Sequence, residues 1–197
     1  WNRKLAGTLV PLFSLRTKTS FGVGDFGDLN KMVDYVASTG QRVLQVLPIN
    51  DSTVTHTWTD SYPYSCISIF ALHPMYADLR QLPALKDADE AKRFHELQKQ
   101  LNALSQIDYE AVNKAKREYM KLLFAQEGKA MMQTDEYKKF FDESQEWLVP
   151  YAQYCYLRDT NGTADFSKWQ DHNQWDEADR KALCNSRSKA FRNVEFY

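Results

Sequence analysis

The first 50 residues alternate between short apolar runs and polar loops in the order strand, helix, strand. Residues 6–15 are typical of a brief strand followed by a turn. Residues 29–37 carry apolar side chains at helical spacing after Asp28, which can cap the helix, and Gly40 follows as its terminal glycine. The continuous apolar run at 41–49 indicates a strand buried on both faces. We therefore expect one βαβ unit with parallel strands and a right-handed crossover.

Beyond residue 80 the pattern changes to amphipathic helices, with apolar side chains at three- and four-residue steps. The expected helices cover residues 87–104, residues 108–125, a stretch capped by Thr134, residues 147–157 and residues 176–187. The run at 147–157 is the most apolar, so we expect it to be the buried helix. This change of pattern divides the chain into residues 1–79, the βα units with their loops, and residues 80–197, a helical subdomain. The fold class is α/β and helix-rich overall.

Two distinctive loops follow the two predicted strands. Function in parallel α/β folds collects at the carboxyl ends of the strands, which is where these loops begin. Loop 16–27 contains Gly22 and Gly24, but without a third glycine and an acidic partner it does not predict a dinucleotide site. Loop 50–74 contains the less ordinary stretch WTDSYPYSCISIFALHP. It is therefore the stronger candidate for a functional site.

This stretch gathers three aromatic residues, Trp58, Tyr62 and Tyr64, around Asp60 and Ser61. A pyranose has C–H faces that lie on aromatic rings and a rim of hydroxyl groups that form hydrogen bonds. Such a loop can therefore bind sugar. The alternative is an ordinary surface loop whose aromatic side chains fold back into the core.

Composition narrows the class of protein further. Hydrophobic residues at 43% and charged residues at 26% are typical of a globular chain. The net charge of −1 predicts neither a nucleic-acid nor an anionic-membrane partner, and no apolar run is long enough for a membrane span. Three widely spaced cysteines and four scattered histidines form neither a disulfide framework nor a metal site, so we expect a cytoplasmic protein with reduced thiols and no cofactor. The absence of an initial Met suggests a piece of a longer protein.

Several of these segments resemble the amylomaltase, or 4-alpha-glucanotransferase, family of glycoside hydrolase family 77. They are AGTLVPLFSL, FGVGDFGDL, STGQRVLQVLPIND and DSYPYSCISIFALHP. The resemblance is dense over residues 6–79 and looser afterwards. Tyr62 and His73 make the chain most similar to the plant cytosolic disproportionating enzymes and their bacterial relatives.

The resemblance implies the N-terminal fragment of a (β/α)8 barrel followed by a helical insertion. It also implies transfer of α-1,4-glucan segments, such as maltose or maltodextrins, to acceptor sugars with retention of configuration. In the family the three catalytic carboxylates lie on later barrel strands, so the resemblance assigns no catalytic residue here and predicts that the chain alone is inactive. Exposed barrel edges could pair two copies as a dimer.

For the substrate site, the resemblance assigns Tyr64 the ring that stacks on glucose beside the scissile bond. Asp60 and Ser61 match positions that shape this site, and Trp58 falls near a position of glucan contact outside it. Asp25 matches an aspartate that braces its loop or contacts ligand. Tyr62 has no counterpart in the commonest members.

Two other classes of function remain open at this point. One is a noncatalytic α-glucan-binding module, in which Trp58, Tyr62 and Tyr64 bind glucan unaided. The other is a helical interaction domain with an incidental aromatic loop. A βαβ unit with too few strands to close a sheet favours the enzyme fragment, because a binding module should own a complete core.

Overall fold

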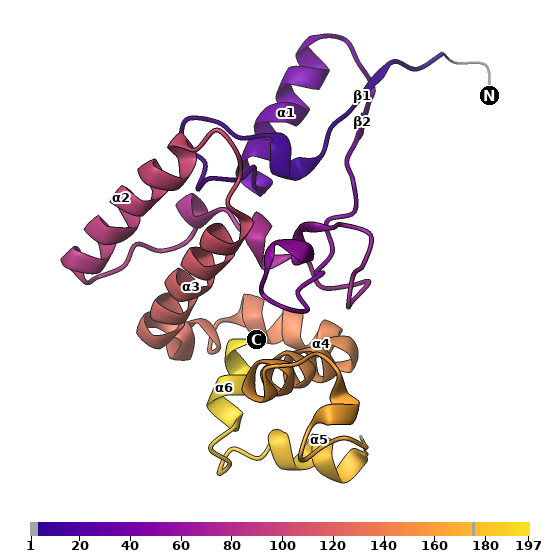
Figure 1. The fold of residues 1–197 in the computed structure, drawn as a ribbon, viewed down its shortest axis with the longest axis vertical. Helices are drawn as coiled ribbons and strands as arrows, with labels where there is room; N and C mark the ends of the chain where they lie inside the picture. The colour runs from indigo at the N-terminus through magenta and orange to yellow at the C-terminus, as the bar shows by residue number, and fades with distance from the viewer. Residues whose placement is uncertain (1–3, 175) are drawn as a thin grey trace. The chain divides into compact units, whose positions relative to one another are not determined.

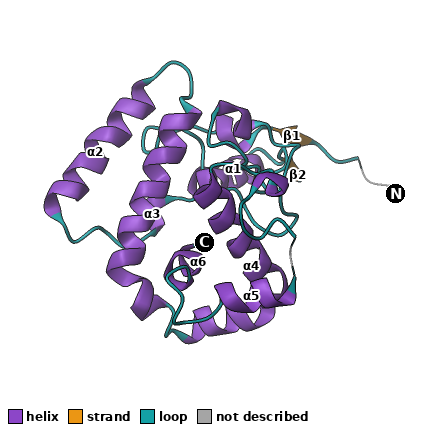
Figure 2. Cartoon of the chain, turned by 60° about the horizontal axis from the view of Figure 1, so that its bottom comes forward, coloured by secondary structure: helices purple, strands orange, loops and turns teal. Residues whose placement is uncertain are grey.

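The computed structural model of the protein describes residues 4–174 and 176–197. Figure 2 shows that strands are confined to β1 and β2 and that helices and loops make up the rest of the described chain. The strands are β1 (Gly7–Leu9) and β2 (Val43–Gln45), and the helices are α1 (Phe26–Ser38), α2 (Ala88–Ala103), α3 (Tyr109–Met131), α4 (Asp135–Asn161), α5 (Glu177–Leu183) and α6 (Phe191–Phe196). The expectation of a helix-rich chain with one parallel pair of strands is confirmed.

The strands β1 and β2 pair in parallel, with Thr8 opposite Leu44, and α1 connects them (Figure 1). Both strands are shorter than the apolar runs suggest, and the prediction that residues 41–49 are buried on both faces is wrong. Leu9 is 57% exposed and Val43 is 43% exposed. The described residues supply only these two strands, so no further strand covers them.

Helix α1 has a well-defined start and end. It begins at Phe26 rather than at Asp28, because Asp25 is the N-cap and accepts a 3.0 Å hydrogen bond from the Asp28 N–H. The Asp28 carboxylate faces the Asp25 N–H in return, which completes a capping box. At the other end Gly40 has a φ of +77° and its N–H donates to the Ala37 carbonyl, as predicted for the terminal glycine.

The described chain packs as two compact units. Unit 1 contains the described residues up to Ile67 together with Leu72–Met120, and unit 2 contains Ser68–Ala71 and Lys121–Tyr197. The boundary falls within α3, whereas the sequence pattern placed a boundary between residues 79 and 80. The division of the whole protein into domains 1–79 and 80–197 therefore stays a prediction.

In unit 1, α2 packs against the first part of α3. The Phe94 and Tyr119 rings meet edge to face at 5.1 Å, and Val112 is fully buried. The predicted helix start at residue 87 is confirmed, because Asp87 is the N-cap of α2 and its carboxylate accepts hydrogen bonds from the backbone of the first turn. Helix α3 continues beyond the predicted end at residue 125 to Met131.

In unit 2, α4 joins two segments that the sequence pattern kept apart. Thr134 caps it as predicted, and the helix runs through Pro150 to a left-handed Gly162 at +65°. Its last three turns hold most of its buried side chains, which confirms the predicted burial for the second half of residues 147–157. The last predicted helix is wrong in extent, because α5 ends at Leu183 and α6 follows separately. The core of unit 2 contains Leu157, Trp169 and Leu183.

Candidate functional site

The loop that follows β2 is closed at its base within unit 1. An isolated antiparallel bridge joins Asn50 to Leu72, and the His73 N–H donates to the Ile49 carbonyl at 2.9 Å. Inside this base the Ile67 N–H donates to the Asp51 carbonyl at 2.7 Å. These bonds hold the two ends of the loop together beyond the carboxyl end of β2, where loops of parallel sheets carry function.

Asp60 organises the interior of this loop. Its buried carboxylate accepts hydrogen bonds from the N–H groups of Thr55 at 3.1 Å and His56 at 2.6 Å and from the Thr55 hydroxyl at 3.0 Å. His56 lies in the left-handed region with a φ of +58°, which a side chain rarely adopts without such support. The Ser52 hydroxyl donates to the Asp60 carbonyl at 2.6 Å. Asp60 thus braces the loop from inside.

The aromatic side chains of the loop point outward. Trp58 is 68% exposed, Tyr62 is 59% exposed and Tyr64 is 60% exposed. The Tyr62 and Tyr64 rings lie side by side, with centroids 5.5 Å apart and planes inclined by 54°. The alternative in which these rings fold back into the core is therefore wrong. Exposed rings on a braced loop are the type of surface on which a pyranose can stack.

Trp58 and Ser61 lie on a 3-10 helix, Trp58–Ser61, whose two ends are tied. The Ser61 hydroxyl donates to the Trp58 carbonyl at 2.7 Å. The Trp58 N–H donates to the Glu110 carboxylate of α3 at 2.9 Å. The side chain of Glu110 therefore fixes the backbone at the position from which the Trp58 indole projects.

A cluster of charged side chains lies within the same unit and is largely buried. Arg80 is its centre: its Nη2 lies 2.6 Å from the Asp25 carboxylate, its Nε 2.6 Å from Asp78 and its Nη1 3.3 Å from Asp28. The three aspartates are all buried. Gly27 leaves room for this arrangement, because a Cβ there would approach the Asp78 carboxylate to 2.0 Å. This group of charges is called the Arg80 cluster below.

Lys116 of α3 adds a second cation beside the Arg80 cluster. Its side chain is 1% exposed, and its Nζ donates to the carbonyls of Met75 at 2.7 Å and Ala77 at 2.8 Å. Burial lowers the pKa of Lys116 to about 8, against the opposing charges of Asp25 and Asp78. The lysine thus anchors α3 to the segment that follows the loop.

The carboxylates of the Arg80 cluster differ in electrostatics. Burial raises the pKa of Asp25, outweighing the Asp28 N–H and the nearby cations. Burial also acts to raise the pKa of Asp28, but hydrogen bonds from Ser20 and Thr17 and the charge of Arg80 lower it on balance. Asp25 was predicted either to brace its loop or to contact ligand. The structure shows it as a brace, because its side chain caps α1 and binds Arg80.

Unit 2 contains an aromatic-walled cavity of about 280 Å³. Its lining consists of Pro150, Tyr154, Leu157, Phe166, Trp169 and His172. The His172 Nδ1 lies 2.7 Å from the Asp179 carboxylate. The lining is mostly apolar and has few groups that can form hydrogen bonds with the hydroxyl groups of a sugar. The loop of unit 1 is therefore the better candidate for a carbohydrate site.

Sequence reasoning identified the exposed aromatic residues of the site but missed its supports. The Asp25-x-x-Asp28 spacing carried a local signal, because an N-cap acid followed three residues later by a second acid is a capping pattern. Arg80, Lys116 and Glu110 carried none. Each has at least one partner 39 or more residues away in the chain, and local patterns do not record such pairings.

The described residues contain no group of three or more His, Cys, Asp and Glu side chains placed to hold a metal ion. Among the helices of residues 4–174 and 176–197, none combines the length and apolar character that crossing a membrane requires.

The fold is similar to that of a solved amylomaltase. The chain superposes on amylomaltase from Corynebacterium glutamicum with a TM-score of 0.66 and 20% sequence identity, over 98% of this chain and 26% of that one. At this identity the likeness establishes the fold alone.

The chain belongs to the 4-alpha-glucanotransferases of glycoside hydrolase family 77, because the model of that family matches residues 10–197. It is 40% identical over 164 residues to 4-alpha-glucanotransferase DPE2 of rice, Oryza sativa subsp. japonica, covering 83% of this chain and 17% of the rice protein. It is 33% identical over 164 residues to the 4-alpha-glucanotransferase of Chlamydia muridarum, covering 83% of this chain and 30% of that protein. The chain thus spans less than a third of either relative. The family resemblance seen in the sequence is confirmed.

Proposed function

We propose that this chain is part of a 4-alpha-glucanotransferase that transfers α-1,4-glucan segments to acceptor sugars, and that residues 58–64 form one wall of its glucan groove. The observation that carries the proposal is the exposed Tyr62 and Tyr64 pair on a loop braced by Asp60. Family membership supports it, because relatives similar to this chain are named for that activity. Maltose and maltodextrins are the proposed donors, and glucose or maltose the proposed acceptors.

Four residues of the loop have proposed roles. Tyr64 stacks on the C–H face of a glucose unit, since its ring is exposed and free of the core. Asp60 and Ser61 hold the backbone that presents this ring, because their side chains bind groups of the loop itself. Trp58 offers a further ring for glucan, on a backbone fixed by Glu110.

The proposed transfer is a retaining double displacement, with one carboxylate as nucleophile and a second carboxyl group as acid and then base. Among the described residues, the buried acids Asp25, Asp28 and Asp78 are engaged with Arg80, and Asp60 is engaged within its loop. None of these four is available to attack a sugar. As the family resemblance implies, we assign the catalytic carboxylates to later parts of a (β/α)8 barrel, and we propose that β1, α1 and β2 form its first unit. Residues 1–197 alone should be inactive.

The decisive experiment measures glucose release and chain-length redistribution from maltose and maltotriose. It compares residues 1–197, the full-length protein that carries them, and the full-length Tyr64→Ala variant. Transfer by the full-length protein only, reduced by Tyr64→Ala, is the expected result. Turnover by residues 1–197 would contradict the assignment of the catalytic groups. Glucan binding by a full-length protein that transfers nothing would favour the noncatalytic binding module instead.

A further inference from the structure

The rings of Tyr62 and Tyr64 are inclined to each other. Their planes are inclined by 54°, their centroids lie 5.5 Å apart, and each side chain is about 60% exposed. The two hydroxyl groups form no hydrogen bond to another described residue, so both can reach a ligand. The pair therefore presents two exposed aromatic rings whose planes differ in orientation.

The backbone beneath this pair is fixed in position. The Tyr62 N–H donates to the Thr59 carbonyl at 3.2 Å, which ends the 3-10 helix. Pro63 follows directly and restricts its own φ and the conformation of Tyr62, which is extended at φ −73° and ψ 111°. Asp60 secures the start of the same segment. The backbone of this segment therefore loses little conformational entropy when a ligand binds, which favours binding.

Two inclined faces fit a bent oligosaccharide better than a flat one. The axial bond of an α-1,4 linkage turns each glucose ring relative to the next, so the C–H faces of neighbouring units are not coplanar. A single ring can stack on one unit only. A second ring at an angle can contact the neighbouring unit at the same time.

We propose that Tyr62 contacts the glucose unit that adjoins the Tyr64-stacked unit on the side away from the scissile bond, and that it thereby sets a preference for donors of three or more units. This inference rests on the proposed function. Tyr62 acts here on binding and not on the chemical step, because its ring lies one unit away from the bond that Tyr64 flanks.

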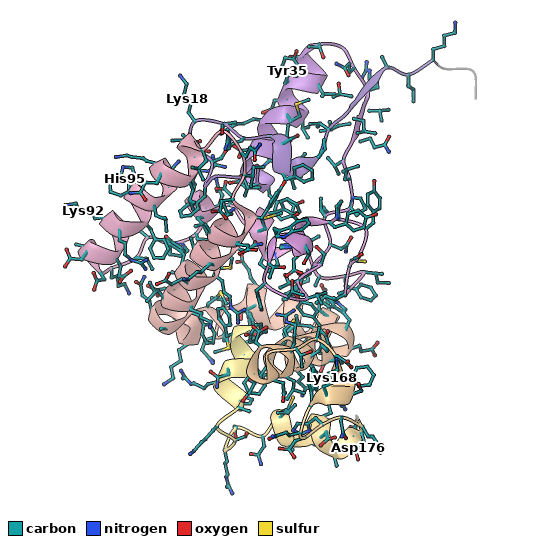
Figure 3. All side chains as sticks on the ribbon, viewed as in Figure 1. Lys18, Tyr35, Lys92, His95, Lys168 and Asp176 are labelled. Carbon is teal, nitrogen blue, oxygen red and sulfur yellow. The ribbon has the colours of Figure 1, made fainter. Side chains whose placement is uncertain are left out.

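The test uses the full-length protein and three substitutions of one residue. Tyr62→Ala removes the ring, Tyr62→Leu keeps apolar bulk without an aromatic face, and Tyr62→Phe keeps the ring without its hydroxyl group. Tyr35→Ala is the matched control, since Tyr35 is also 59% exposed but lies on α1 (Figure 3). The measurements are kcat and KM with maltose, maltotriose and maltoheptaose as donors, with thermal unfolding as a check of folding.

We expect Tyr62→Ala and Tyr62→Leu to lower kcat/KM for maltotriose and maltoheptaose by about 3- to 10-fold, mainly through KM, because one aromatic stacking contact is lost. For maltose the loss should be less than about twofold, since a disaccharide does not reach the second ring. Tyr62→Phe should retain most of the activity. The unfolding temperature of every variant should match that of the wild type, because the ring is exposed.

Three results would overturn the inference while leaving the proposed function intact. The first is an equal loss for maltose and maltotriose. The second is full activity of Tyr62→Leu, and the third is a Tyr62→Ala variant that behaves like Tyr35→Ala with every donor. A wild-type protein that transfers glucan from none of these donors would instead contradict the proposed function.

Discussion

Two regions of unit 1 reverse the usual distribution of residue types. The Arg80 cluster and Lys116 place charged side chains inside, whereas the loop at 58–64 places large aromatic rings outside. Burying charge costs free energy unless partners compensate, and exposing apolar rings gives up hydrophobic burial. The first region should therefore govern stability with little effect on ligand, and the second should govern ligand binding with little effect on stability.

The largest expected effect is on stability, from Arg80→Ala. Removing the guanidinium leaves Asp25, Asp28 and Asp78 close together without their shared partner. We expect the free energy of unfolding to fall by about 3 kcal/mol, at the lower end for breaking a buried ion pair because Arg80 is partly exposed. Urea unfolding measures this value.

The control for Arg80→Ala is Arg93→Ala. Arg93 binds Glu90 at 2.7 Å and Glu118 at 2.8 Å, but all three side chains are at the surface. Exposed ion pairs contribute about 0.2–1 kcal/mol, so this variant should unfold almost as the wild type does. If Arg80→Ala and Arg93→Ala lower the free energy of unfolding equally, the Arg80 cluster stabilises the fold no more than an exposed ion pair does.

The sequence predicted the outward-facing region better than the inward-facing one. The helix signals were local: Gly40, Asp87 and Thr134 lie where the pattern placed helix ends. The aromatic loop was also recognisable, because its rings and its family motif lie within a few residues of each other.

The charged partners escaped prediction because they are far apart in the chain. Arg80 lies 55 positions from Asp25, and no periodic pattern links them. The apolar run at 41–49 misled for a similar reason. An apolar run of this kind is typical of a strand that other strands and helices cover. The described residues provide only β1 as a partner for β2, so the run stays partly exposed.

The next effect concerns both stability and ligand binding, through Asp60→Ala. The N–H groups of Thr55 and His56 lose their acceptor, which should lower the free energy of unfolding by about 1–3 kcal/mol. The same change frees the backbone that carries Tyr62 and Tyr64, so glucan binding should weaken although Asp60 itself is buried. Calorimetric titration with maltoheptaose and thermal unfolding measure the two losses.

Asp60→Asn is the intermediate variant, because it retains one acceptor oxygen in the same position but removes the charge and the second acceptor. We expect it to fall between the wild type and Asp60→Ala in both measurements. Normal glucan affinity in a destabilised Asp60→Ala protein would show that the brace does not position the rings.

Tyr64→Ala should leave stability unchanged and lower glucan transfer by about tenfold, equal to about 1.4 kcal/mol of lost transition-state stabilisation. The ring is 60% exposed, so its removal costs the folded state little. Initial rates with maltotriose and a melting curve on the same sample provide the test. Equal relative losses of rate and stability would identify Tyr64 as a residue of the fold.

The smallest expected effect is a change in the pH dependence of stability at His73, which lies between the loop at 58–64 and Asp78 in the sequence. Its buried imidazole accepts a 3.0 Å hydrogen bond from the Met75 N–H through Nδ1 and caps a 3-10 helix, Pro74–Tyr76. Burial lowers the pKa of His73 below 6.5, although the charges of Asp51 and Asp60 oppose this shift. The unfolded chain therefore binds a proton before the folded protein does.

His73 should thus stabilise the fold fully above pH 6.5, and this contribution should be lost as the pH falls through 6.5 toward the lower pKa of the folded state. His73→Asn keeps an acceptor for the Met75 N–H and cannot titrate. We expect the wild type to lose more free energy of unfolding between pH 7 and pH 5 than His73→Asn loses. Parallel urea titrations at the two pH values measure the difference. Identical losses would mean that the imidazole is charged in the folded state as readily as in the unfolded chain, and that burial at this position leaves its pKa unchanged.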